Sequence, residues 1–112
     1  MKIISKSDNI NERQLFQLTE GGTSAKLKDS VGRRFDAVGY IHYTDNDRKN
    51  GEEREMLIII TADGDSLATN SSTVIRTFKK MLDCFPLPIS DIEITSDINQ
   101  KTGREFLNLM LI

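Results

Sequence analysis

The sequence predicts a mainly β fold with a single α-helix in the second half of the chain. Apolar and polar residues alternate over residues 34–44, which is the period of a β-strand. Residues 55–62 contain three consecutive isoleucines, whose branched side chains favour a strand buried on both faces. Residues 72–85 repeat apolar side chains every three or four positions, the period of an amphipathic helix. At 112 residues, the chain is expected to form one domain over residues 1–112.

The N-terminal third is mostly polar. Residues 2–5 predict either a short strand or part of a loose N-terminal arm over residues 1–13. Residues 14–19 predict a short strand. Residues 20–24 contain two glycines and predict a flexible loop, which a basic stretch continues to about residue 34.

The strand over residues 34–44 is predicted to have two different faces. One face carries Phe35, Ala37, Gly39, Ile41 and Tyr43, and the other carries Asp36, Val38, Tyr40 and His42. Gly39 in mid-strand predicts a bulge or a sharp bend that curls the sheet. Residues 45–53 predict a polar hairpin loop with its turn at Asn50-Gly51.

The second half predicts a turn, a helix and a final hairpin. Asp63-Gly64 predicts the turn into a short strand at residues 66–70. Ser71 and Ser72 are candidate N-caps of the helix, and Pro86 and Pro88 end it. Two further strands follow, at residues 89–96 and 104–112.

This order predicts an OB-fold-like, five-stranded antiparallel barrel with the helix between strands 3 and 4. OB-folds bind oligonucleotides. Other small α+β sheets share the same order of elements.

Residues from 61 onward carry short motifs at the turns. These are Thr61-Ala62-Asp63-Gly64, the segment Thr69–Thr73, the helix through Phe78, and the hairpin Lys101–Leu107. In these motifs the chain resembles the single-stranded-DNA-binding proteins of phages and mobile elements of Gram-positive bacteria. The resemblance covers about the second half, and the first half matches only in its strand pattern. It implies DNA binding during replication, in the cytoplasm of the bacterial host.

Charge is segregated along the chain. The net charge of −2 argues weakly against nucleic-acid binding, because affinity depends on neutralising phosphates. Residues 24–34, however, carry four cations and one carboxylate, whereas residues 83–97 carry four carboxylates and no cation. The basic stretch is therefore either a solvated loop or a phosphate contact.

Candidate binding residues are the cations of the basic stretch and the final hairpin, with nearby ring side chains. They are Lys26, Lys28, Arg33, Arg34, Tyr40, His42, Lys101, Arg104 and Phe106. Single-strand binders combine a positive groove with aromatic platforms. The alternatives are that Tyr40 and His42 cover the barrel and that Phe106 is packed. Arg54 is expected to pair with a neighbouring glutamate, and Arg76, Lys79 and Lys80 to be only solvated.

Several other functions are not expected. One cysteine, Cys84, and one histidine allow no intrachain disulfide and no structural zinc site. Neither Asp45-Asn46-Asp47 nor Asp63-Gly64-Asp65 fits a metal loop, and no nucleophile has a base partner. The hypothesis is therefore a non-enzymatic, cofactor-free protein that coats single-stranded DNA, with no membrane segment. The alternative is a small phage-type protein-interaction module, an inhibitor or assembly factor. Replication partners are unknown, and a homo-oligomer is one option for the assembly state.

Overall fold

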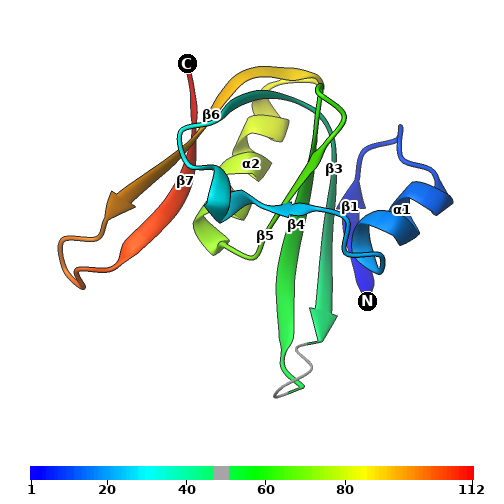
Figure 1. Cartoon of the computed structure of the whole chain (residues 1–112), viewed down its shortest axis with the longest axis horizontal. Helices are drawn as coiled ribbons and strands as arrows, with labels where there is room; N and C mark the ends of the chain where they lie inside the picture. The colour runs from blue at the N-terminus through cyan, green and yellow to red at the C-terminus, as the bar shows by residue number, and fades with distance from the viewer. Residues whose placement is uncertain (47–50) are drawn as a thin grey trace.

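The computed structural model describes residues 1–46 and 51–112 (Figure 1). Along the chain the elements are β1 (Lys2–Lys6), α1 (Glu12–Thr19), β2 (Ala25–Lys26), the 3₁₀ turn η1 (Leu27–Ser30), β3 (Arg34–Asn46), β4 (Glu53–Thr61), β5 (Ser66–Thr69), α2 (Ser72–Cys84), β6 (Ile89–Ile98) and β7 (Glu105–Leu111). The predicted strands from residue 34 onward and the predicted helix agree with β3–β7 and α2 to within two residues. Asn50 of the predicted Asn50-Gly51 turn lies outside the described residues.

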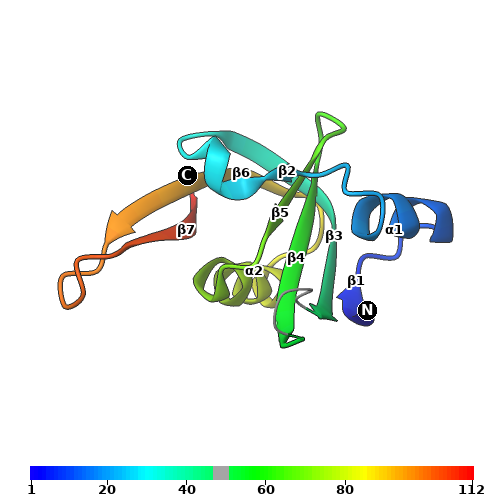
Figure 2. The same cartoon turned by 60° about the horizontal axis from the view of Figure 1, so that its bottom comes forward.

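One sheet contains all the strands. Its order is β2-β5-β4-β3-β6-β7, with β1 paired to the second half of β3. The β2–β5 pair is parallel and the other pairs are antiparallel. The sheet curls into a half-barrel around α2, and the β6–β7 hairpin extends away from it (Figures 1 and 2).

The mainly β prediction with a curled sheet is confirmed, but the five-stranded antiparallel barrel is wrong. Over the described residues the sheet is mixed and has seven strands, and α2 lies between the fifth and sixth of them. The extra strands are β1 and β2. A short strand is one of the two structures that the sequence predicts for the β1 segment, and β2 has only two residues. Both lie in polar sequence, where the alternation that predicts a strand is weak.

The predicted strand at residues 14–19 is wrong, because these residues belong to α1. Asn11 caps this helix: its side chain accepts a hydrogen bond from the Gln14 backbone N–H at 2.8 Å, and the Gln14 side chain accepts one from the Asn11 N–H at 3.1 Å. This reciprocal cap satisfies donors that a helix start leaves open. Leu15 and Leu18, three residues apart, then pack on the sheet.

A bulge in β3 divides the core into two clusters. The register with β4 shifts between Ala37 and Gly39, which confirms the bulge predicted at Gly39. One extra residue reverses the face that each later side chain occupies. The prediction that Phe35 and Ala37 share a face with Ile41 and Tyr43 is therefore wrong. Phe35 and Ala37 pack in the cluster under α2, whereas Ile41 and Tyr43 pack in the cluster under α1.

Helix α2 closes the concave side of the half-barrel. Ser71 caps it, with its Oγ accepting a hydrogen bond from the Val74 backbone N–H at 3.3 Å. Its buried side chains are Val74, Ile75, Phe78 and Met81, which is the predicted stripe. Phe78 is fully buried, as its central position in the stripe predicts.

Candidate nucleic-acid interface

Three cations line an open groove with a volume of about 480 Å³. They are Lys26 at the end of β2, Lys28 in η1 and Arg54 at the start of β4. We call this hollow the cationic groove. Its other lining residues are polar or apolar: Ser24, Met56, Ala68, Thr69, Asn70, Ser71 and Leu107.

Local structure presents the two lysines to solvent. Leu27 between them is completely buried, so it anchors η1 in the core, while Lys26 and Lys28 are exposed. The parallel pairing of β2 with β5 places Lys26 opposite Ala68, which also lines the groove. The cations of this segment are therefore held on a structured edge of the sheet and not on a free loop.

The lining of the groove carries net positive charge, and Asp45 lies opposite Arg54 in the β3–β4 pair outside that lining. None of its lining residues is a carboxylate. Within residues 1–46 and 51–112, no ion pair involves Lys26, Lys28 or Arg54. The acidic stretch lies elsewhere, because Asp83, Asp91, Glu93 and Asp97 are all absent from the groove lining. The acidic stretch therefore stays out of the groove, although its Glu93 pairs with Arg34 of the basic stretch.

A second hollow, of about 380 Å³, lies at the β6–β7 hairpin, and we call it the hairpin hollow. Its lining residues come from α2 and the hairpin: Thr73, Arg76, Asn99, Thr102, Arg104, Glu105 and Phe106. Two of the candidate binding residues, Arg104 and Phe106, therefore lie together. Lys101 is exposed in the same hairpin but does not line this hollow.

Arg33 and Arg34 are placed away from both hollows and are already paired. The Arg33 guanidinium donates two hydrogen bonds to the Asp65 carboxylate, at 2.7 and 2.9 Å. This contact, together with the Thr61 hydroxyl, lowers the pKa of Asp65 to about 2. Arg34 Nε lies 3.2 Å from Glu93 Oε1. The basic stretch is thus split, and only its two lysines face the groove.

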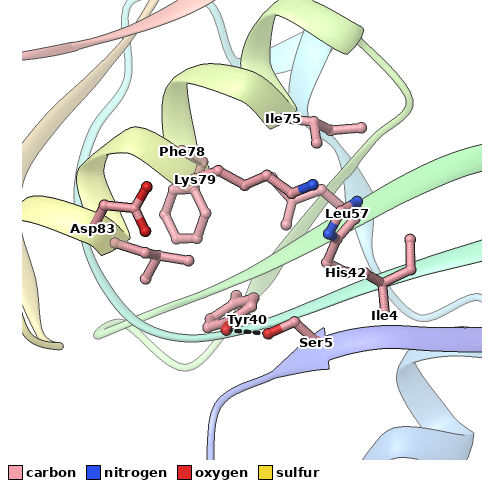
Figure 3. Close-up of a pocket in the computed structure, with 10 residues that line it drawn as sticks. Ile4, Ser5, Tyr40, His42, Leu57, Ile75, Phe78, Lys79 and Asp83 are labelled. Carbon is pink, nitrogen blue, oxygen red and sulfur yellow. Dashed lines mark hydrogen bonds between the residues drawn. The ribbon is translucent and has the colours of Figure 1, made fainter.

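Tyr40 and His42 lie beneath α2, where His42 is buried and Tyr40 is partly buried (Figure 3). The Tyr40 hydroxyl is 2.6 Å from Ser5 Oγ, and its ring packs against Phe78. His42 is only 2% exposed, and its Nε2 lies 2.6 Å from Glu55 Oε1. Both line a separate hollow of about 270 Å³ that shares no residue with the cationic groove.

Arg54 and Arg76 line the two hollows although sequence reasoning does not select them. The sequence predicts that Arg54 pairs with an adjacent glutamate. Because side chains alternate between the two faces of a strand, Arg54 of β4 points to the face opposite Glu53 and Glu55. This alternation is the sequence feature that could have identified Arg54. Arg76 is predicted to be only solvated, and nothing in its helical position distinguishes it from Lys80, which does not line the hairpin hollow.

Comparisons with known proteins assign the chain to no family. Models of protein families, curated protein sequences and solved structures give no significant match to it. The described residues contain no group of three or more His, Cys, Asp or Glu side chains able to hold a metal ion. None of the helices in residues 1–46 and 51–112 has the length and apolar character to cross a membrane.

Proposed function

We propose that the protein binds single-stranded DNA without sequence specificity, in the cationic groove. The observation that carries the proposal is a groove with Lys26, Lys28 and Arg54 in its walls and no carboxylate among its lining residues. The role is stoichiometric: the protein coats the strand during DNA replication, as the resemblance to phage proteins implies. It involves no reaction and no cofactor.

The composition of the groove suits a flexible strand. Cations would contact successive phosphates, and the release of their counterions would drive binding. Hydroxyl and amide groups of Ser24, Asn70 and Ser71 can donate to phosphate or sugar oxygens. Met56 and Leu107 offer apolar surface to exposed bases. A duplex presents no such free base faces, so the same groove should favour single strands.

The strand pairing gives a second line of support. β3 pairs with both β4 and β6, and α2 connects β5 to β6. We interpret β3–β7 with α2 as an OB-fold-like unit whose barrel is incompletely closed, with β1, α1 and β2 added to it. OB-folds bind oligonucleotides across strands 2 and 3, between two hairpin loops. In this interpretation β4 and β5 are those strands, and both contribute to the cationic groove.

A second candidate function is a protein-interaction module that does not bind nucleic acid. It is favoured by an apolar hollow of about 290 Å³ between the end of α2 and the end of β7. Phe85, Leu111 and Ile112 line it, each at least 40% exposed. Exposed apolar patches often mark contacts with other proteins.

A fluorescence anisotropy titration with labelled oligo-dT at two salt concentrations tests the proposal. Binding at low salt that weakens as salt rises, with an unlabelled duplex competing poorly, is the expected result. Absence of binding at micromolar protein and low salt would refute the proposal and favour the interaction module. Equal competition by the duplex would refute the preference for single strands.

A further inference from the structure

The hairpin hollow combines two kinds of group that single-strand binders use together. Phe106 on β7 is exposed over 36% of its surface. Arg76 of α2 and Arg104 of the hairpin line the same hollow. No ion pair involves either arginine within residues 1–46 and 51–112. The one carboxylate of the lining, Glu105, accepts a hydrogen bond from Ser96 Oγ at 2.7 Å.

The fold holds Arg76 and Phe106 in a fixed relation. The Thr77 hydroxyl, next to Arg76, donates a hydrogen bond to Asn108 Oδ1 at 2.7 Å, which joins α2 to β7. Along β7, Leu107 packs against the core cluster under α2, so its neighbour Phe106 points to the other face of the strand. The guanidinium and the ring are therefore presented from two rigid elements.

The hairpin hollow and the cationic groove share no lining residue, but their linings come within two residues of each other along the chain where α2 begins. Ser71 lines the groove and Thr73 lines the hollow, two residues apart where α2 begins. On β7, Leu107 lines the groove and Phe106 lines the hollow, from opposite faces of the strand. A DNA strand leaving the groove would pass the start of α2 to reach the hollow.

From this arrangement we infer that the hairpin hollow is a second nucleotide subsite on the path of the strand. One base stacks on Phe106, and Arg76 and Arg104 contact the adjoining phosphates. A planar guanidinium suits phosphate oxygens, and a phenyl ring accepts any base, so the subsite adds affinity without sequence preference. Helix α2 thereby takes part in binding. The inference rests on the proposed function of the cationic groove.

The test uses a series of labelled oligo-dT lengths, from about 4 to 16 nucleotides, the span of known OB-fold site sizes. Wild-type affinity is expected to rise with length until the strand reaches the hairpin hollow. Phe106→Ala should lose that last increase, by about 5- to 150-fold in Kd, with an unchanged salt slope. Arg76→Gln should also lose affinity for long strands and reduce the salt slope by about 0.7. Neither change should alter binding of the shortest strand that the groove holds.

Two controls make the result specific. Lys80→Gln changes an exposed cation one turn along the same helix but outside the hollow, and should bind every length as the wild type does. Phe106→Tyr retains a stacking ring and should restore long-strand affinity. Because Arg76 is exposed, its variant keeps the test available if Phe106→Ala does not fold.

Each remaining outcome has one meaning. If the wild type binds but Phe106→Ala and Arg76→Gln match it at every length, the subsite is refuted and the groove proposal stands. If the wild type binds no oligo-dT, the proposed function itself fails and the subsite fails with it.

Discussion

The rings of Tyr40 and Phe78 meet edge to face, with their centroids 5.8 Å apart and their planes at 65°. Tyr40 comes from β3 after its bulge, and Phe78 from the middle of α2 (Figure 3). This geometry is a favourable arrangement for two aromatic rings. The contact joins the helix to the sheet and holds the Tyr40 ring beneath α2.

Phe78 should contribute more to stability than any exposed phenylalanine. Phe78→Ala removes a fully buried ring and is expected to lower the free energy of unfolding by about 3–5 kcal/mol. Phe16→Ala, at a side chain that is 65% exposed, is the matched control and should change it by less than about 0.5 kcal/mol. Urea titrations followed by circular dichroism measure both. A loss below about 1 kcal/mol for Phe78→Ala would contradict the assigned core.

Tyr40 should matter for folding and not for binding. Tyr40→Phe removes the hydroxyl that lies 2.6 Å from Ser5 Oγ and is expected to cost about 0.5–1.5 kcal/mol of stability. The affinity of the folded variant for oligo-dT should equal that of the wild type, because Tyr40 lines neither binding hollow. Anisotropy titrations well below the melting temperature measure this. A stable Tyr40→Phe variant with weakened binding would place the strand under α2 instead.

The three groove cations should set the salt dependence of binding. Changing Lys26, Lys28 and Arg54 together to glutamine is expected to reduce the slope of log K against log salt by about 0.7 for each phosphate that is no longer neutralised. Arg13→Gln, at an exposed cation on α1, serves as the control and should leave the slope unchanged. Titrations at four salt concentrations give the slopes. An unchanged slope in the triple variant would place the phosphates outside the cationic groove.

Asp65 should make stability depend on pH in acid. Its pKa is lowered to about 2 by the hydrogen bond from Arg33, whereas an unfolded aspartate has a pKa of about 3.9. The contribution of the Arg33 contact is therefore complete above about pH 4 and is lost as the pH falls toward 2. Asp65→Asn should lower the melting temperature at pH 7 and flatten its decline between those pH values.

The control for this prediction is Asp63→Asn. Asp63 is 77% exposed and lies 3.4 Å from the same guanidinium, so its substitution should have little effect. Thermal melts from pH 7 to pH 2.5 compare the variants. An Asp65→Asn variant as pH-dependent as the wild type across this window would show that the Arg33 contact contributes no net stability.

Gly39 should resist substitution because of its close neighbours. A methyl group there would lie 3.0 Å from Ser7 Oγ and 3.3 Å from both Asn9 Oδ1 and the Ile60 Cδ1 methyl group. Gly39→Ala is expected to cost about 1–3 kcal/mol of stability through overpacking. Chemical denaturation measures the change. If Gly39→Ala left the free energy of unfolding unchanged, β1 and the loop after it would be free to move away from the bulge.

Much of the fold could be predicted from the sequence because the evidence for it is local. The period of two over residues 34–44 and the helical stripe through Phe78 each record burial on a face of one element. The bulge at Gly39 was also predictable, since a glycine in mid-strand is an unusual choice. The N-terminal helix was missed although its signals are local too, since Asn11 and Gln14 have the spacing of a reciprocal cap and Leu15 and Leu18 have helical spacing.

The candidate binding surface depended on the tertiary structure. Among residues 24–34 the cations look alike in sequence, yet Arg33 meets a carboxylate 32 positions away while Lys26 and Lys28 meet none in the described residues. Tyr40 alternates as an exposed residue would, but the bulge and the docking of α2 place it under the helix. The sequence determines which side chains could contact a DNA strand. Only the folded chain determines which of them remain available, because each is taken or left free by partners far away along the chain.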